Sequence, residues 1–501
     1  MQELGINVAS FPKFIDRNLY RSLGLAPSIF FDKETFGADR LVINPTPLAG
    51  GESPELPVSS ADAWKQFLAQ APISEQAKRD LVRLRDEKRD YYPGLSSTEK
   101  KDRIARISYA KFLSEVVGVH ADVLKLFQAG PQPLFGLGID AVSAQDAWGL
   151  GYPGFLGMKL DAAPGPGMNH DAIRSPEAEK YFFHFPDGNA SIARLLVRQL
   201  IPAAIPGKSS TDIVTARANY ARLDEPSSPV RIRLNSTVVR VRHVGDPSSA
   251  KEVEITYSCR GKAYSVRAHN CILACWHVVI PYICPDLPQA QKEALASAAK
   301  VPIVYTNVAL RSWRAFSKLA VSSIYAPASY HTYSTLDLPV SMADYHCART
   351  PDEPIIVHMM RTPCQPGLPS RDQHRIGRMQ LFATTFETFE RNIRDQLARA
   401  LSGGGFDPAR DIAAITVNRW PHGYAYEYNS LWDKFWLEGG EQPCMVARKP
   451  LGRIAIANAD AAAYAYTDAA IDQAYRAVQE LTSSGGALAH KSASRATAAY
   501  L

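Results

Sequence analysis

The stretch Gly452-Arg-Ile-Ala-Ile-Ala-Asn-Ala-Asp460 decides the fold of this chain. A segment of small residues follows it as far as Tyr466, and a helical pattern then runs from Thr467 to Leu481. The two β-branched isoleucines of the stretch come directly after a glycine turn, which predicts a short buried strand. The sequence therefore predicts a strand, a small-residue loop and an amphipathic helix, which is a common unit of α/β proteins.

The start of the predicted helix can be capped by Thr467 or Asp468. Free N–H groups and the positive end of the helix dipole favour an electron-rich or anionic ligand there, and the alanines before it would let that ligand approach the backbone. An α/β element without any ligand explains the same residues equally simply. The helical period predicts one buried face, formed by Ile471, Ala474, Val478 and Leu481.

The composition is that of an ordinary globular enzyme. The 501 residues exceed one comfortable core, so we expect two or more lobes. The formal charge of +6 is small for this length and no basic run suggests nucleic acid as a partner. Seven cysteines without a C-x-x-C pair give no support for a disulfide framework, a metal site or c-type haem attachment.

No membrane or export segment is expected from the sequence. The longest apolar run, Cys271 to Cys284, contains His277 and Pro281 and is shorter than the ~20 residues that span a bilayer. The first residues lack both the basic and the apolar region of a signal peptide. As written, the chain is expected in the cytoplasm.

The C-terminal stretch resembles the flavin-binding motif of the flavin amine oxidase family, R-I-x-F-A-G-x-E, a variable loop and G-Y-x-E-G-A-I-x-S-G-x-R-A-A. Asn458 replaces the usual glycine, and Asp460 and Asp468 stand for glutamates. Within this family the chain is most similar to the bacterial spermidine dehydrogenases, and the resemblance covers most of the chain. The residues in step with the motif are Arg453, Ile454, Ala457, Asp460, Tyr466, Asp468, Ala470, Ile471, Arg476 and Ala477. The phrases that carry the closer similarity are Tyr20–Leu25, Phe185–Ser191 and Arg419–Tyr428.

The resemblance implies an α/β fold with a discontinuous FAD-binding domain, Rossmann-like and of the amine oxidase type, and an inserted substrate domain of mixed sheet and helices. The expected parts are 1–178 (helical and loop-rich substrate-domain part), 179–290 (β-rich FAD-domain part), 291–444 (substrate domain), 445–485 (C-terminal FAD-binding strand, loop and helix) and 486–501 (tail).

The family's opening unit, a strand, G-x-G-x-x-G and a helix that hold the ADP half of FAD, has no counterpart here. Gly149-Leu-Gly-Tyr-Pro-Gly154 matches the letters, but no β-branched strand precedes it and Pro153 stands where a helix should start. We interpret it, and Gly136-Leu-Gly138, as loops. The chain thus resembles a family member that lacks its first βαβ unit, and it would be periplasmic if a missing front end carried an export signal.

Periodicity and turn residues predict the remaining elements. The predicted helices are Ile73–Tyr91, Ser96–Gly118 with a capping box to Glu99, Leu287–Ala299 and Ile376–Leu401. The predicted strands are Val230–Leu234, Val238–Val241, Val253–Tyr257, Tyr264–Ala268 after an Arg260-Gly261 hairpin turn, Cys271–Ala274 and Ile303–Val308, with a mixed sheet over 320–365. The irregular segment Gly130–Gly167 is either functional, packed over a cofactor, or a surface excursion.

Lys300 is the first candidate catalytic residue. It matches the family lysine that holds a water at the flavin N5, where a cation helps to receive reducing equivalents. Without the resemblance, it is a lysine at a helix C-terminus, favoured there by the helix dipole.

Tyrosines are the second group of candidates. The resemblance implies an aromatic cage in front of the flavin, with Tyr466 on one side and Tyr424 or Tyr426 on the other. Aromatic faces stabilise an amine or its cation, and a nearly dry cage lowers the pKa of the amine. Core packing is the alternative for any one of these tyrosines, although three in five residues, interleaved with Ala and Glu, are poor core material.

The resemblance also implies a set of cofactor and substrate contacts. The cofactor residues are Val238 and Val239 at the adenine, Trp420, Asn458, Asp460, Asp468, Ala470 and Ile471. No cysteine precedes Tyr466 in its loop, so FAD is expected to be non-covalent. Glu427 and Asp344 are the candidate anions for the remote ammonium groups of a polyamine. Haem is a further cofactor that the resemblance allows, but no histidine spacing selects a ligand, and no metal site is expected.

These observations predict an FAD-dependent dehydrogenase or oxidase of an amine, most simply a polyamine such as spermidine, that transfers hydride to flavin and lets the imine hydrolyse. One alternative is a truncated, non-catalytic remnant of that enzyme. Another is a flavoenzyme of the same fold that acts on another amine or an amino acid. The electron acceptor and the oligomeric state stay open.

Overall fold

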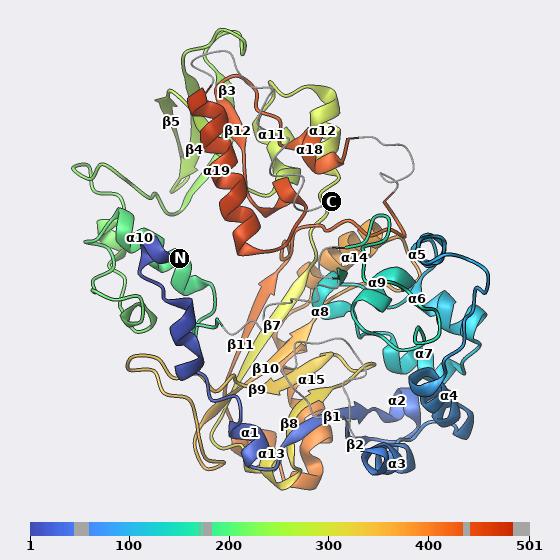
Figure 1. The fold of residues 1–501 in the computed structure, drawn as a ribbon. Coiled ribbons are helices and arrows are strands. Elements are labelled where there is room, and N and C mark those ends of the chain that lie inside the picture. The colour runs from blue at the N-terminus through green and yellow to red at the C-terminus, as the bar shows by residue number, and fades with distance from the viewer. Residues whose placement is uncertain (45–59, 170–171, 174–182, 434–440, 484–501) are drawn as a thin grey trace. The chain divides into compact units, whose positions relative to one another are not determined.

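The structure, a computed structural model, describes the chain except for residues 45–59, 170–171, 174–182, 434–440 and 484–501 (Figure 1). The described chain forms two compact units. Unit 1 comprises Met1–Arg231, Val301–Gly423 and Asn429–Asp433; unit 2 comprises Ile232–Lys300, Tyr424–Tyr428 and Lys434–Leu501.

Unit 1 is built on a seven-stranded mixed sheet in the order β11-β7-β10-β9-β8-β1-β2. Only β1 and β8 pair in parallel, and the other neighbours are antiparallel. The predicted strand Ile303–Val308 and the mixed sheet over 320–365 are therefore confirmed. The strands are β1 (Ala26–Phe31), β2 (Arg40–Ile43), β7 (Ile303–Leu310), β8 (Val321–Tyr325), β9 (Tyr333–Leu336), β10 (Ile355–Arg361) and β11 (Ile412–Trp420).

Both faces of this sheet are covered, as the alternating side chains of β1 show. Ile29 and Phe31 point into a core shared with helices α3 to α7 and α9, whereas Phe30 points into a second core that includes Trp313 and residues of α15. The helices of unit 1 are α1 (Leu19–Ser22), α2 (Lys33–Phe36), α3 (Ala61–Gln70), α4 (Glu75–Asp86), α5 (Ser97–Ala105), α6 (Tyr109–Lys111), α7 (Ala121–Phe127), α8 (Gln132–Phe135), α9 (Ala144–Gly149), α10 (Ala190–Leu200), α13 (Arg314–Lys318), α14 (Ser370–Ala383), α15 (Phe386–Leu401) and α16 (Pro408–Asp411).

The predicted helix Ser96–Gly118 is wrong as a single element. Its capping box is confirmed, because Ser96 and Glu99 bond reciprocally at the start of α5. The helix then stops at Ala105, where a neighbouring segment takes over the backbone: the Ala144 N–H donates to the Ile107 carbonyl and the Tyr109 N–H donates to the Val142 carbonyl. These bonds replace the helical ones, so the chain restarts as α6 and a π-helical turn, Phe112–Val117.

The predicted helix Ile376–Leu401 is also wrong, because it is two helices. α14 begins earlier, after Pro369, and ends at Ala383. Thr384 is extended (φ −85°, ψ 123°), and Thr385 caps the next helix by accepting a hydrogen bond from the Thr388 N–H. The two consecutive threonines therefore end one helix and start another.

The segment 130–167 is not a surface excursion, because it contributes to the core of unit 1. Leu137, Ala141 and Val142 are buried together with Phe135. A Cβ added at Gly149 would lie 2.0 Å from the Ala172 carbonyl oxygen, so this glycine serves a close backbone approach. The letters around it do not form a dinucleotide-binding turn, since a helix rather than a strand precedes them.

Unit 2 holds a three-stranded antiparallel sheet and a two-stranded parallel one. The strands are β3 (Ser236–His243), β4 (Val253–Cys259), β5 (Lys262–Ala268), β6 (Cys271–Leu273) and β12 (Ile454–Ile456). The hairpin turn is confirmed by the positive φ of Arg260 (50°) and Gly261 (75°). The predicted strand Val230–Leu234 is wrong, because β4 ends at Cys259, opposite Ser236, and leaves residues 230–234 without a strand to pair with.

Helices of unit 2 enclose the parallel pair. The helices are α11 (Ile280–Ile283), α12 (Gln289–Ala296, within the predicted Leu287–Ala299), α18 (Pro443–Ala447) and α19 (Thr467–Ser483). A core cluster joins Ile454 and Ile456 of β12 to Leu273 of β6 and to Leu295 of α12. The strand, loop and helix predicted from 452–481 are therefore confirmed as elements.

The predicted buried face of α19 is wrong except at Leu481, and Ala474 is exposed. Ile471 and Val478 are 51% and 46% exposed, and the buried residues are Ala469, Ala477 and Leu481. Ala477 and Leu481 pack against two alanines of the β12 segment. Small residues on both sides bring the helix close to the strand, and this contact, rather than side-chain hydrophobicity, selects the inner face.

Among the described residues, no helix is both long enough and apolar enough to cross a membrane.

Candidate active site

The loop between β12 and α19 is organised by Asn458, which has a positive φ of 90°. A glycine adopts this conformation without steric cost, which explains why the family motif has glycine here. In this chain the asparagine side chain makes two bonds instead: its Nδ2 donates to the Cys275 carbonyl at 2.6 Å, and its Oδ1 accepts from the Asp460 N–H at 2.6 Å. Asn458 therefore ties the loop to the exit of β6 and orients Asp460.

Asp460 forms a buried ion pair with Lys300. Its Oδ1 lies 3.2 Å from the Lys300 Nζ, and the two side chains are 0% and 13% exposed. Its Oδ2 accepts a hydrogen bond from the His277 N–H at 3.1 Å. The distance between Oδ1 and the Lys300 Nζ is that of an ion pair, but the angles do not fit a hydrogen bond. Among the described residues, Oδ1 is therefore a buried acceptor without a hydrogen-bond donor.

Two further titratable side chains lie beside this pair. Burial lowers the pKa of His277 to about 4, although Asp460 opposes this shift, so the imidazole is neutral at neutral pH. Burial also raises the pKa of the Cys275 thiol; Asp460 adds to this shift and Lys300 opposes it. Lys300 is thus the cationic member of the group, and its charge faces one buried carboxylate.

The two predicted aromatic segments meet in unit 2 through Glu427. Its Oε1 accepts a hydrogen bond of 2.8 Å from the Ala465 N–H, between Tyr464 and Tyr466. These two tyrosine rings lie 4.7 Å apart between centroids, tilted by 32°, and Tyr466 is 40% exposed just before α19 begins. Glu427, predicted as an anion for a substrate ammonium, therefore already has a structural role as the link between the segments.

The structure distinguishes the two candidate partners of Tyr466. Tyr426 is only 5% exposed and contacts the edge of Tyr428, whose hydroxyl in turn accepts from the Cys444 N–H. Tyr424 is partly exposed. Tyr426 thus occupies a core position, and Tyr424 is the more accessible aromatic face.

The other predicted cofactor residues of unit 2 lie in two places, on β3 and at the start of α19. Val238 and Val239 are 39% and 48% exposed on β3, where the register shifts by a β-bulge before Arg240. Asp468 and Ile471 are exposed in the first turns of α19, and Ala470 is half-buried. The acidic Asp468 complements the positive helix end and so reduces its attraction for an anionic ligand.

Two predicted residues belong to unit 1. Trp420 ends β11 and is 54% exposed. Asp344 is exposed and follows Ala343, which has a positive φ of 52°. Neither joins the buried group around Lys300 within one unit, and their roles stay predictions.

Sequence reasoning missed three residues of the group. The sequence gives no indication that His277, Cys275 and Tyr464 belong to a site. A histidine and a cysteine after an apolar strand, and a tyrosine in an alanine-rich loop, are common core residues. The parallel pairing of β6 with β12 sets Cys275 and His277, which follow β6, beside the loop that carries Asp460, whereas Tyr464 lies two residues before Tyr466 in that loop.

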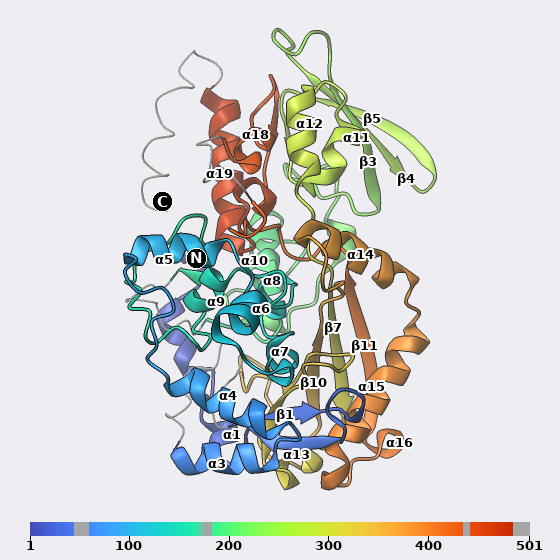
Figure 2. The same cartoon turned by 90° about the vertical axis from the view of Figure 1, so that its right-hand side faces the viewer.

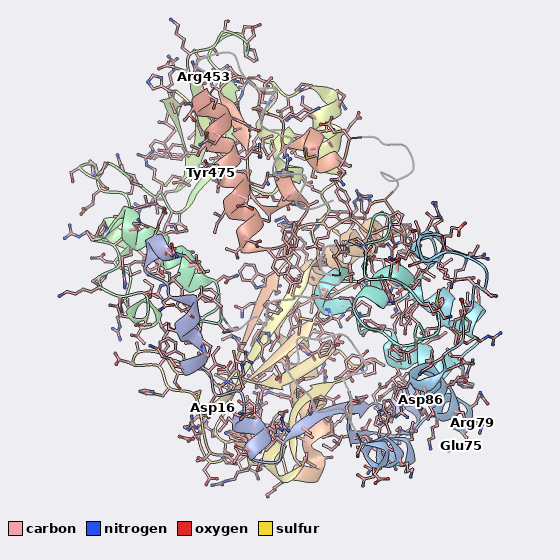
Figure 3. All side chains as sticks on the ribbon, in the orientation of Figure 1. Asp16, Glu75, Arg79, Asp86, Arg453 and Tyr475 are labelled. Atoms are coloured by element: carbon pink, nitrogen blue, oxygen red, sulfur yellow. The ribbon has the colours of Figure 1, made fainter. Side chains whose placement is uncertain are left out.

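Arg453, at the start of the 452–460 stretch, has a structural role. Its backbone N–H donates to the His243 Nε2 at 3.1 Å, and its Nε donates to the Ala250 carbonyl at 3.3 Å (Figure 3). His243 also contacts the Asp286 carboxylate at 2.9 Å. This motif arginine therefore fastens the start of β12 to the β3–β4 hairpin.

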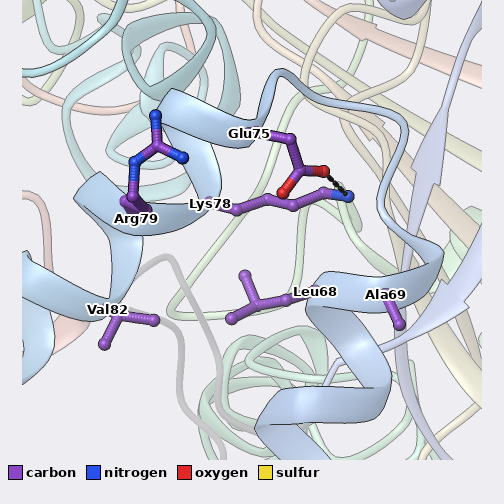
Figure 4. Close-up of a pocket in the computed structure, with 6 residues that line it drawn as sticks. All are labelled: Leu68, Ala69, Glu75, Lys78, Arg79 and Val82. Carbon is purple, nitrogen blue, oxygen red and sulfur yellow. Dashed lines mark hydrogen bonds and ion pairs between the residues drawn. The ribbon is translucent and has the colours of Figure 1, made fainter.

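A hollow of about 490 Å³ lies between α3 and α4 in unit 1 (Figure 4). Leu68, Ala69 and Val82 form its apolar lining, and the Glu75–Lys78 ion pair of 2.8 Å lies at its margin together with Arg79. None of the predicted site residues lines it, so we do not assign it to the candidate active site.

Comparisons with known proteins give distant likenesses. A scan of family profiles and a search of curated proteins found no match. Among solved structures, the chain is similar to a wild-type putrescine oxidase bound to putrescine, with 14% identity, 93% of this chain and 84% of that chain covered, and a TM-score of 0.47. It is similar to cyclohexylamine oxidase from Brevibacterium oxydans at the same identity and coverage, with a TM-score of 0.45. At these values the likeness carries no argument about cofactor, substrate or site residues.

Proposed function

We propose that this chain belongs to an FAD-dependent amine oxidase or dehydrogenase and that its substrate is a polyamine such as spermidine. The observation that carries the proposal is the buried Lys300–Asp460 pair at 3.2 Å, formed by the motif acid of the β12–α19 loop and the motif lysine after α12. A surface lysine would need no buried counter-charge, and this one is 13% exposed.

The residues around the pair fit a flavin ring in their chemistry. A flavin presents carbonyl and ring-nitrogen acceptors at one edge and a large aromatic face, so it is served by a fixed cation and by an aromatic wall. Lys300 supplies the cation, and the buried Asp460 holds its charge in place. Tyr466, in tilted contact with Tyr464, supplies an exposed aromatic face. FAD, when bound, would supply the hydride acceptor, which no side chain can provide.

The protein's own contribution is positioning and electrostatics. The tyrosine face can hold the amine by cation–π attraction and, by excluding water, lower the amine pKa so that the neutral form reacts. The Glu427–Ala465 bond keeps the two aromatic segments in register. The ammonium of Lys300 favours electron density that develops nearby, because its charge is set before the reaction starts.

The test is to purify the chain, add FAD, and record the visible spectrum before and after anaerobic addition of spermidine, putrescine or an amino acid. Bleaching of the flavin bands by spermidine supports the proposal, and bleaching only by an amino acid would replace the substrate. Flavin that binds but stays oxidised with every amine removes the amine chemistry. A chain that takes up no FAD would be the non-catalytic remnant, and a Soret band would establish haem.

Lys300→Met in the same assay separates binding from chemistry. We expect it to keep FAD uptake but to slow bleaching by roughly a hundredfold, because a preorganised charge contributes on the order of 3 kcal/mol at such sites. Lys449→Met, at an exposed ion pair with Glu441, is the matched control and should leave both readouts unchanged.

A further inference from the structure

Four large apolar side chains lie exposed along α14 and the start of α15. We call them the apolar ridge: Ile376, Met379, Phe382 and Phe386, which are 37%, 67%, 63% and 47% exposed. Single exposed apolar residues are normal on protein surfaces, but a contiguous group of large ones marks an interaction site. The ridge lies entirely within unit 1.

The packing of α14 determines which of its sides is exposed, and the apolar ridge lies on that side. The inner side includes Gln373, Gly377 and Leu381, at helical spacing. A Cβ at Gly377 would lie 1.9 Å from the Pro363 carbonyl oxygen, so α14 is pressed against that segment. Met379 and Phe382 must then point outward.

The apolar ridge continues across the break between α14 and α15. α14 ends at Ala383, and Thr385 caps α15, which places Phe386 in the first turn of the new helix. The Arg419 Nη1 donates to the Thr384 carbonyl at 3.2 Å and thereby fastens the break to the end of β11. Figure 2 shows this connection projecting beyond β11, the edge strand of the sheet.

Arginines border the ridge. Arg375 and Arg378 precede Met379 and Phe382 by four residues each and so lie on the same side of α14. Arg375 forms an ion pair of 3.1 Å with Asp372, an acidic residue on the same side of α14. Burial and the neighbouring Arg375 lower the pKa of Arg378, which still leaves a guanidinium charged at neutral pH. Glu390, four residues after Phe386, is paired with Arg394 at 2.8 Å. With Arg419 at the break, three further cations accompany the apolar side chains, against Asp372 and Glu387.

We propose that the apolar ridge and its arginines bind the surface of an anionic phospholipid bilayer. Met379, Phe382 and Phe386 would enter the boundary between headgroups and acyl chains, and the arginines would meet the lipid phosphates. Projecting side chains at a helix–helix bend suit insertion, and long arginine side chains reach headgroups from the flanks. The inference is independent of the proposed function.

Vesicle flotation of the full chain tests the proposal. We expect the chain to float with vesicles of phosphatidylglycerol and phosphatidylcholine, and to float much less with phosphatidylcholine alone or at high salt. The double variant Met379→Ser/Phe382→Ser should bind roughly tenfold more weakly, and Arg378→Gln roughly fivefold more weakly.

The matched control is Leu196→Ser/Leu200→Ser on α10, whose side chains are 43% and 53% exposed. It should float like the unaltered chain. The proposal is overturned if the chain binds no vesicle, if it binds both vesicle types equally, or if the ridge variant binds as well as the control. It is also overturned if the ridge variant instead abolishes a dimer seen by sedimentation, because the ridge would then cover a second copy of the chain. Thermal unfolding of every variant checks that the fold is kept.

Discussion

At the scale of the residue, the Lys300–Asp460 pair is the feature from which the site follows. Asp460 is fully buried, and its only ionic partner among the described residues is Lys300. Two charges removed from water are costly unless they offset each other. The intact ion pair therefore adds little to the free energy of unfolding. The loss of only one of its two charges, in contrast, would leave the other buried without a partner.

Removing one member should be costly. We expect Asp460→Asn to lower the free energy of unfolding by roughly 3 kcal/mol, because Lys300 would keep a buried charge without a partner. The double variant Lys300→Met/Asp460→Asn should recover much of that loss in urea unfolding. If the double variant is as unstable as the sum of both single ones, the two charges are not coupled. Lys449→Met, at the exposed Lys449–Glu441 pair, should change the free energy by less than about 1 kcal/mol.

The backbone conformation of Asn458 is strained, but its side chain makes two stabilising hydrogen bonds. Asn458→Ala would keep the positive φ of 90° and lose both side-chain bonds, whereas Asn458→Gly would lose the same bonds but remove the strain. We expect alanine to destabilise the chain by roughly 1 kcal/mol more than glycine does, measured by urea unfolding. Equal effects of the two substitutions would mean that the backbone at this position is not strained.

His277 predicts a pH dependence of stability. Its pKa is about 4 in the folded chain and about 6.5 when unfolded, so the unfolded chain binds more protons between these values. The stability from its neutral form is present above about pH 6.5 and is lost as the pH falls towards 4. Between about pH 7 and pH 5, His277→Asn should therefore lose about 2 kcal/mol less stability than the unaltered chain. Parallel pH profiles for the two proteins would contradict the assignment.

At the scale of the element, α19 shows that packing distance can override hydrophobicity. Its inner face is made of alanines and one leucine, against the alanines that flank Ile456. A helix can approach a strand this closely only where both surfaces are small. The larger Ile471, Tyr475 and Val478 are left outside, with Tyr475 69% exposed.

Substitutions in α19 test this close approach. Ala477→Leu should destabilise unit 2 by about 2 kcal/mol, because the added methylenes have no room beside Ala455 and Ala457. Val478→Ala, one residue further and 46% exposed, should change the free energy of unfolding by less than about 0.5 kcal/mol. A tolerated leucine at 477 would show that the helix can move away from β12.

At the scale of the whole molecule, the chain passes between its two units five times, at residues 231–232, 300–301, 423–424, 428–429 and 433–434. Lys300 ends one segment of unit 2, and Tyr424 begins another. The residues proposed for catalysis (Lys300, Tyr424, Tyr426 and Tyr466) therefore all belong to unit 2, although three separate segments of the chain supply them.

Cofactor binding should be visible in the stability of the whole chain. Free FAD at roughly a hundred times its dissociation constant should raise the free energy of unfolding by about 2.7 kcal/mol, because it binds only the folded form. Differential scanning calorimetry with and without FAD measures this, with ATP as the control ligand. An equal shift with ATP would indicate a nucleotide site rather than a flavin site.

The sequence by itself determined the local elements and the chemistry available. The glycine turn and isoleucines of 452–456 specify β12, the Arg260-Gly261 pair specifies the β4–β5 hairpin, and Ser96 with Glu99 specifies the start of α5, because each depends on a few neighbouring residues. Lys300, Asp460 and Tyr466 could be proposed as site residues from their match to a family motif. Nothing local could show that Asp460 is the partner of Lys300.

The tertiary structure alone decided where helices stop, which faces are buried and which charges meet. The helix that starts at Ser97 stops because a remote segment engages its backbone, and α19 packs inward through its alanines because Ala455 and Ala457 of the facing segment are small. Lys300 and Asp460 are 160 residues apart in the sequence. Asp460 follows β12 and Lys300 follows α12, and they meet because α12 packs through Leu295 on the core that the parallel pair β6 and β12 forms. Such long-range packing has no signature in any short stretch of the chain.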